Sequence, residues 1–80
     1  MDDAKRLKNE KEFDRWDELP AGGRRYYFDV QGKSGGFARY IKIADINEKT
    51  ISFVQEIYDS AGNLSSIHEK YPIDKGHQKL

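Results

Sequence analysis

Hydrophobic and polar residues alternate with a period of two in four consecutive segments that begin at Arg24, and this feature constrains the fold most. The segments are 24–31 (RRYYFDVQ), 37–45 (FARYIKIAD), 50–59 (TISFVQEIYD) and 64–71 (LSSIHEKY). Each is rich in β-branched and aromatic residues and is bounded by Gly, Asn or Asp, as strands are. Because the connections are short, the pattern favours an antiparallel meander of four strands.

The segment 59–62 (DSAG) predicts the geometry of the last connection. Aspartate suits the first position of a type I turn and glycine suits the left-handed position, which together make a hairpin with a G1 bulge. The pairs that follow from this turn are Tyr58–Leu64, Glu56–Ser66, Val54–His68 and Ser52–Lys70. This register predicts that Glu56, His68 and Lys70 lie together on one face of the sheet.

The same register separates an apolar face from a second, aromatic face. The apolar face is predicted to contain Tyr26, Phe28, Val30, Phe37, Ile41, Ile43, Ile51, Phe53, Ile57, Ile67 and Tyr71. The second face is predicted to contain Tyr27, Tyr40, Val54, Tyr58 and Leu64. That second face suits either a helix packed on the sheet or a binding partner.

Residues 2–19 have the composition of a helix, with no glycine or proline before Pro20. We expect residues 1–10, which are highly charged, to fray, and residues 11–80 to form a single domain. Phe13 and Trp16 are expected to dock on the sheet, because leaving a Trp side chain in water forfeits about 2 kcal/mol of burial. The predicted class is therefore α+β, mainly β: an N-terminal helix on a four-stranded antiparallel meander, with a half-closed barrel as the alternative.

Composition limits the functions available to a chain of 80 residues. A domain of this size has a small core and little room for a large buried catalytic cleft. There is no cysteine, so a disulfide framework or a thiolate metal site is excluded, and a reducing cytoplasm is the expected compartment. No apolar run approaches the roughly 20 residues of a membrane span, so no membrane partner is expected. We expect no cofactor and no metal.

The charges are unevenly distributed, although their sum is zero. Residues 21–44 contain five bases and one acid, so this third of the chain is the part that attracts anions. The predicted ligand-binding residues are Arg24, Arg25, Arg39, Tyr40 and Lys42. Tyrosines among basic residues favour the binding of RNA or another single-stranded nucleic acid, because its bases can stack on the tyrosine rings.

The two histidines suggest a second kind of chemistry. Two imidazoles with a nearby cation can cleave RNA by acid–base catalysis, and the candidates are Glu56, His68, Lys70 and His77. The simpler interpretation, which the sequence favours, is that both histidines are solvated surface groups. His77 follows Pro72 in a segment whose pattern does not fix its position. The nine-residue spacing of the histidines matches no zinc-binding pattern.

The runs GGRRYYFDV, ARYIKIAD, FVQEIYDSAGNL and HEKYPIDKGH resemble a family of small bacterial domains of unknown function. Those domains share an R-R-Y-Y, Q-E-I-Y-D, H-E-K-Y-P and G-H pattern, and the resemblance covers residues 22–77. It implies a compact, mainly β unit and transfers no catalytic residue.

These observations predict a monomeric binding module of the bacterial cytoplasm that acts as a protein-interaction or accessory domain rather than as an enzyme. The first alternative is nucleic-acid binding through residues 24–42. The second alternative is a small histidine-dependent ribonuclease.

Overall fold

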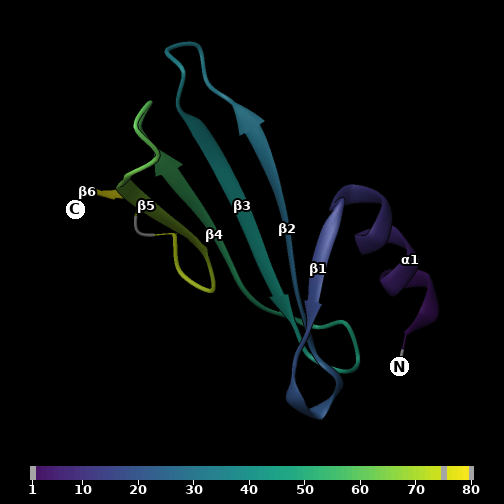
Figure 1. Cartoon of the computed structure of the whole chain (residues 1–80). Helices are drawn as coiled ribbons and strands as arrows, with labels where there is room; N and C mark the ends of the chain where they lie inside the picture. Colours follow the sequence, from purple (N-terminus) through teal and green to yellow (C-terminus); the bar gives the residue numbers. More distant parts are fainter. Residues whose placement is uncertain (1, 75, 80) are drawn as a thin grey trace.

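The strands follow one another across a single twisted sheet, and the only α-helix of the described residues lies beside its first strand (Figure 1). The computed structural model describes residues 2–74 and 76–79. The elements are α1 (Asp3–Glu12), β1 (Arg15–Glu18), the 3-10 turn η1 (Pro20–Gly22), β2 (Arg24–Gln31), β3 (Phe37–Ala44), β4 (Thr50–Tyr58), β5 (Leu64–Tyr71) and β6 (Gly76–Lys79). In this part of the chain, no helix is long and apolar enough to cross a membrane.

The mainly β class and the antiparallel meander are confirmed, whereas the number of strands is wrong. The sheet has six strands among the described residues, because β1 and β6 each add one at an edge. It is also open, since these two edge strands do not pair with each other, so the barrel alternative is wrong.

The predicted helix over residues 2–19 is correct only as far as Glu12. Asp2 caps α1 by accepting a hydrogen bond from the backbone N–H of Lys5 at 3.1 Å. After Phe13 the chain extends and pairs with β2, which places Trp16 opposite Tyr26. Helix-forming residues therefore become a strand here, because pairing and burial outweigh local propensity.

The connections after β3 and β4 have the same geometry. The G1-bulge turn predicted at residues 59–62 is confirmed: Asp59 N–H donates to Asn63 O at 2.9 Å, and Gly62 has a φ of +85°. In the turn between β3 and β4, Asp45 N–H likewise donates to Lys49 O, at 3.0 Å. There the left-handed position is taken by Glu48, whose φ is +64°.

The predicted register between β4 and β5 is wrong beyond the first pair. Tyr58 does face Leu64, but a register shift follows between Ile57 and Tyr58. As a result Glu56 pairs with Ile67 rather than with Ser66. A one-residue shift moves every following side chain to the other face, because side chains alternate along a strand.

The predicted division into faces changes accordingly. The helix-side face, toward which Phe13 projects, carries Tyr26, Phe28, Tyr40, Lys42, Phe53, Gln55, His68 and His77. The outer face carries Tyr27, Asp29, Arg39, Ile41, Val54, Glu56 and Ile67. Aromatic residues thus concentrate on the helix-side face, whereas the apolar face predicted from the sequence mixed residues of both.

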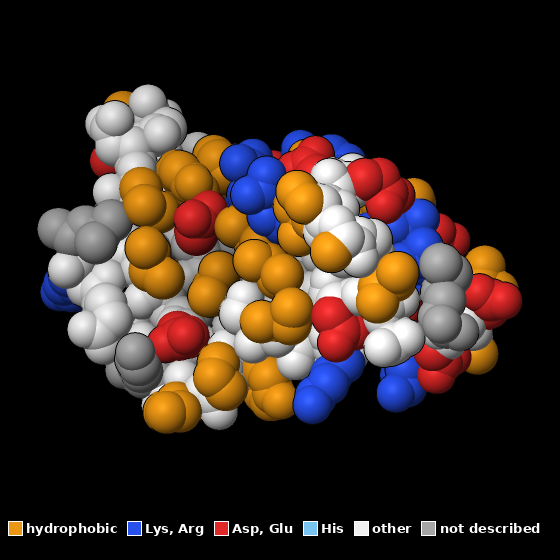
Figure 2. All heavy atoms as spheres, turned by 90° about the horizontal axis from the view of Figure 1, so that it is seen from below, with side chains coloured by type: hydrophobic (Ala, Val, Ile, Leu, Met, Phe, Trp, Pro, Cys, Tyr) orange, Lys and Arg blue, Asp and Glu red, His pale blue; other side chains and the backbone are white. Residues whose placement is uncertain are grey.

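The core lies between α1 and the first strands of the sheet. Phe13, Tyr26 and Ala44 are buried, and Trp16, Phe28 and Phe53 pack against them. Phe13 packs on the sheet as predicted, whereas Trp16 packs against the core from within strand β1 and not from a helix. Much of the apolar side-chain area stays at the surface, and Figure 2 shows hydrophobic side chains gathered between charged ones on one side of the molecule.

Glu48 joins α1 to the sheet through a buried carboxylate. Its side chain is fully buried and accepts hydrogen bonds from Arg6 Nε at 2.7 Å, Asn9 Nδ2 at 2.8 Å and Tyr26 Oη at 2.7 Å. Burial by itself raises the pKa of Glu48, but the bonds from Asn9, Tyr26 and Arg6 outweigh burial, so the net effect is a lowered pKa. The predicted fraying of residues 1–10 stays a prediction, and these bonds hold the helix from Arg6 onward.

We expect acid to weaken the protein through Glu48. Because its pKa is lower in the folded state than its usual value of 4.5, its contribution to stability is complete above that value and is lost as the pH falls through the lower folded value. The urea concentration at the midpoint of unfolding should therefore decrease as the pH is lowered from about 5 to about 2. Glu48→Gln should show a weaker dependence over that range. An equal dependence in both proteins would contradict the assignment.

Candidate nucleic-acid interface

Aromatic rings from three neighbouring strands form a row on the helix-side face. Phe28, Tyr40 and Phe53 come from β2, β3 and β4, and the centroids of successive rings are 4.9 Å and 6.1 Å apart. The rings stack on one another, so their faces are already occupied by neighbouring rings and are not free to stack on a ligand. Tyr71 on β5 pairs with Phe53 and is 43% exposed, which makes it the accessible ring beside this row.

A β-bulge turns Lys70 onto the same face as the aromatic row. The register shifts between Phe53 and Val54, so that Lys70 is the extra residue of β5. Its Nζ atom lies 5.3 Å from the centroid of the Tyr40 ring and 6.0 Å from that of Phe53. A cation above aromatic rings in this way is stabilised by the ring quadrupoles.

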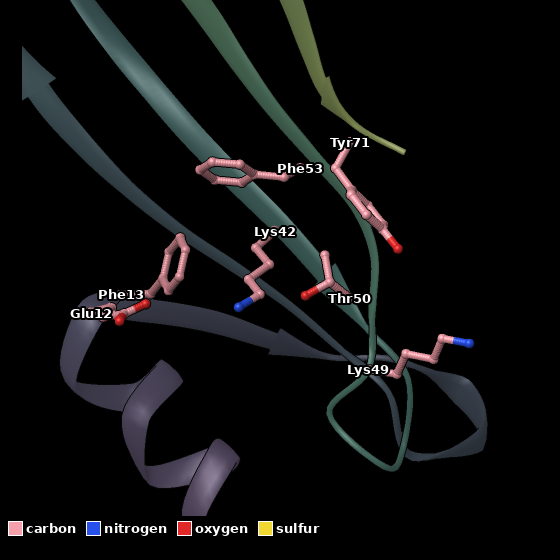
Figure 3. A pocket seen from close by; sticks show the side chains of 7 residues that line it. All are labelled: Glu12, Phe13, Lys42, Lys49, Thr50, Phe53 and Tyr71. Atoms are coloured by element: carbon pink, nitrogen blue, oxygen red, sulfur yellow. The ribbon is translucent and has the colours of Figure 1, made fainter. Parts of the chain in front are cut away.

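An open cavity of about 470 Å³ lies between the end of α1 and the strands β4 and β5. Its lining residues are Glu12, Phe13, Lys42, Lys49, Thr50, Phe53 and Tyr71 (Figure 3). Figure 3 shows the rings of Phe13, Phe53 and Tyr71 arranged around Lys42, with Lys49 at the far rim. The volume is in the range of pockets that hold small planar ligands, and the lining is mainly apolar with a few charged groups.

The cations of this cavity differ from the other cations of the sheet. Lys42 Nζ donates to Asn9 Oδ1, a neutral amide oxygen, at 2.8 Å, and Lys49 is exposed. Among the described residues, neither of these two ammonium groups nor that of Lys70 lies in an ion pair. They are therefore available for an anionic ligand.

The structure divides the basic residues predicted to bind a ligand. Arg25 and Arg39 lie on the outer face, where each pairs with an aspartate. Arg24 lies on the helix side and pairs with Glu10 at 2.7 Å and Glu18 at 2.9 Å. Only Tyr40 and Lys42 of the predicted set belong to the open part of the helix-side face.

The outer face is neutralised by its own carboxylates. Asp29 accepts from Arg39 at 2.8 and 3.0 Å, and Arg15 lies 3.0 Å from the same carboxyl group. The bond from Arg39 is the main cause that lowers the pKa of Asp29, and Asp29 in turn raises the pKa of Arg39. Arg39 therefore has a partner already, which reduces its attraction for a further anion.

The two histidines meet on the helix-side face. His68 pairs with His77 across β5 and β6, and the centroids of their rings are 4.6 Å apart. His68 Nε2 lies 2.5 Å from Asp74 Oδ1, and the N–H of Gly76 donates to the same oxygen at 3.0 Å. The bond from Gly76, followed by that from His68, lowers the pKa of Asp74. Asp74 is therefore a carboxylate at neutral pH and orients the His68 ring.

The predicted group of Glu56, His68, Lys70 and His77 is only partly assembled. His68, His77 and Lys70 share the helix-side face, whereas Glu56 lies on the outer face and accepts from Tyr58 Oη at 2.8 Å. The expectation that Glu56 joins His68 is wrong. The register shift between Ile57 and Tyr58 places His68 opposite Gln55, so His68 and Glu56 lie on opposite faces of the sheet.

Sequence reasoning missed Asp74, although a local signal was present. Its side chain accepts from the backbone N–H two residues ahead, at Gly76, which is an Asx-turn. An aspartate two residues before a glycine after β5 could have indicated a turn and a returning strand. Among the described residues, no three side chains of the metal-binding types lie close enough to hold a metal ion.

Comparison with known proteins adds no relative to this description. No family model, no curated protein and no solved structure matches the chain. The resemblance to a family of small bacterial domains stays a prediction.

Proposed function

We propose that this protein binds single-stranded RNA along the open part of its helix-side face. The observation that carries the proposal is the aromatic cavity whose lysines, Lys42 and Lys49, form no ion pair among the described residues. Lys70 and the histidine pair lie farther along the same face. Single-stranded RNA presents unstacked planar bases on a chain of phosphates, so it needs apolar pockets and cations side by side.

The cavity supports the recognition of one base. The rings of Phe13, Phe53 and Tyr71 provide apolar walls, and a base in contact with such rings gains about 1–3 kcal/mol. Lys42 and Lys49 lie at the wall and rim of the same cavity, where the phosphates of the bound nucleotide would pass. These contacts do not read a particular sequence, because every base has an aromatic face.

The rest of the strand would continue along β5 toward the histidines. His68 precedes Tyr71 by three residues, which corresponds to roughly 10 Å along a strand. Lys70 lies between them and supplies a cation for an intervening phosphate. The proposal keeps the expected bacterial cytoplasm as the compartment, since a chain without cysteine needs no oxidising environment.

Removing Lys49 and Lys70 together should weaken RNA binding and its dependence on salt. We would measure fluorescence anisotropy of a short labelled 2′-O-methyl RNA, which keeps the charges and bases. Each phosphate contact contributes about 0.7 to the slope of log affinity against log salt, so Lys49→Ala with Lys70→Ala should reduce the slope by about 1.4.

The matched control removes two cations that lie off this face. Arg25→Ala with Lys33→Ala changes the net charge equally, but Arg25 is on the outer face and Lys33 is in the β2–β3 loop. This variant should keep the salt slope of the unaltered protein. Equal losses of RNA affinity in both double variants, or no RNA binding at low salt, would reject the proposed face. Either result would favour a protein partner instead.

A further inference from the structure

We infer that His68 and His77 cleave the bound RNA strand. In this reaction the 2′-oxygen of a ribose attacks the phosphorus of the adjacent phosphodiester. The inference rests on the proposed function, because the strand has to lie along the helix-side face. It depends on a placement that the sequence did not reveal: two imidazoles in contact across β5 and β6, one of them held by a carboxylate.

Asp74 determines which nitrogen of His68 is free to react. A carboxylate only accepts hydrogen bonds, so the proton between His68 and Asp74 lies on His68 Nε2. In the neutral ring the other nitrogen, Nδ1, is then a proton acceptor. Asp74 also stabilises the imidazolium that forms when Nδ1 takes a proton, which is the role of the carboxylate in a catalytic triad.

The two rings have different surroundings, which suits different roles. The His68 side chain is 17% exposed and is held by Asp74, whereas His77 is exposed to solvent. We therefore assign His68 as the general base and His77, in its protonated form, as the general acid. A neutral imidazole accepts a proton and a protonated imidazole donates one, so two imidazoles can supply both roles.

The reaction balances without a metal or a further reactant. His68 Nδ1 takes the proton of the 2′-hydroxyl while the 2′-oxygen forms a bond to the adjacent phosphorus. The bond between phosphorus and the 5′-oxygen breaks, and His77 gives its proton to that oxygen. The products are a 2′,3′-cyclic phosphate end and a 5′-hydroxyl end, and the two histidines have exchanged protonation states.

Lys70 is placed to stabilise the charge that develops on phosphorus oxygens. It follows His68 by two residues in β5, and the bulge at this position turns it onto the same helix-side face. The attraction between a cation placed in this way and the phosphate oxygens is stronger in the transition state than in the ground state. This difference lowers the barrier.

The test is cleavage of a short RNA labelled at its 5′ end, in EDTA, with the products separated by mass. Wild-type protein should give fragments that end in 2′,3′-cyclic phosphate. His68→Ala and His77→Ala, purified in the same way, should each lower the rate by at least about 100-fold, which is the usual contribution of one general acid or base. Their affinity for the 2′-O-methyl strand should fall less than that of the protein with Lys49→Ala and Lys70→Ala, because the cavity and the lysines are unchanged.

Two further variants separate catalysis from folding. Asp74→Asn should lower kcat by about 10-fold or more with KM little changed, and the ¹⁵N spectrum of His68 should show loss of the Nε2–H tautomer. Glu56→Gln is the matched control on the outer face and should cleave at the wild-type rate. A purely structural Asp74 would alter stability but not this balance of kcat and KM.

The outcomes separate this inference from the proposed function. If the wild-type protein binds the 2′-O-methyl strand but leaves RNA intact, the inference is overturned and the binding proposal stands. If His68→Ala and His77→Ala cleave at the wild-type rate, the histidines are not the catalytic residues. If the protein neither binds nor cleaves, both proposals fail together.

Discussion

Replacing Glu48 by alanine is expected to lower the free energy of unfolding by about 3–5 kcal/mol. The carboxylate is the common acceptor for Arg6, Asn9 and Tyr26, all within 2.8 Å, so its removal leaves three donors without a partner. A domain of this size has only a few kcal/mol of net stability, so we expect the variant to be largely unfolded. Urea unfolding followed by circular dichroism measures the change.

Two variants in the same turn show which part of this effect is due to the backbone. Glu48→Gly also removes the carboxylate, but glycine adopts the positive φ of this position freely, so it should cost about 1 kcal/mol less than alanine. Asn47→Ala changes an exposed neighbour and should stay within about 0.5 kcal/mol of the wild type. A Glu48→Ala protein as stable as Asn47→Ala would refute the role assigned to the carboxylate.

Replacing Phe13 by alanine should cost about 3–5 kcal/mol as well, for a different reason. Phe13 is 3% exposed, and its ring contacts those of Tyr26, Phe28 and Phe53 at centroid distances of 5.3 to 6.4 Å. Truncation leaves a cavity at the junction of α1 and the sheet, because the strands cannot close around it without losing their pairing.

The control for Phe13 is an apolar residue of the same region that is not buried. Leu7 lies on α1 and is 58% exposed, so Leu7→Ala should change stability by less than about 0.5 kcal/mol. Both variants are compared by the midpoint of urea unfolding at an unchanged slope. If Phe13→Ala and Leu7→Ala were equally stable, the core would have to lie elsewhere.

The two turns of identical geometry show where local sequence signals are sufficient. The turn at residues 59–62 was predicted correctly, because an aspartate and a glycine in this spacing are favoured by that backbone alone. The geometry of the turn at residues 45–49 was not predicted, because its left-handed residue is Glu48. A glutamate is chosen there for its contacts with Arg6 and Asn9, which are far away in the sequence.

The candidate site shows the same division. His68, Lys70 and His77 were named from the sequence, because two histidines and a lysine near one strand suggest acid–base chemistry. Their grouping with Glu56 was wrong, because no residue type near Tyr58 indicates the register shift in the sequence. Asp74 was missed because its position depends on β6 pairing with β5.

The amino-acid sequence by itself determined the four inner strands, their order and the hairpin at residues 59–62, because alternation and turn preference act over a few residues. The tertiary structure decided the edge strands, the end of α1 and the side on which each residue of β4 and β5 lies. Those outcomes depend on pairing and burial between distant segments, and a single bulge is enough to reverse a face. The meeting of His68, His77 and Asp74 is one of these long-range outcomes.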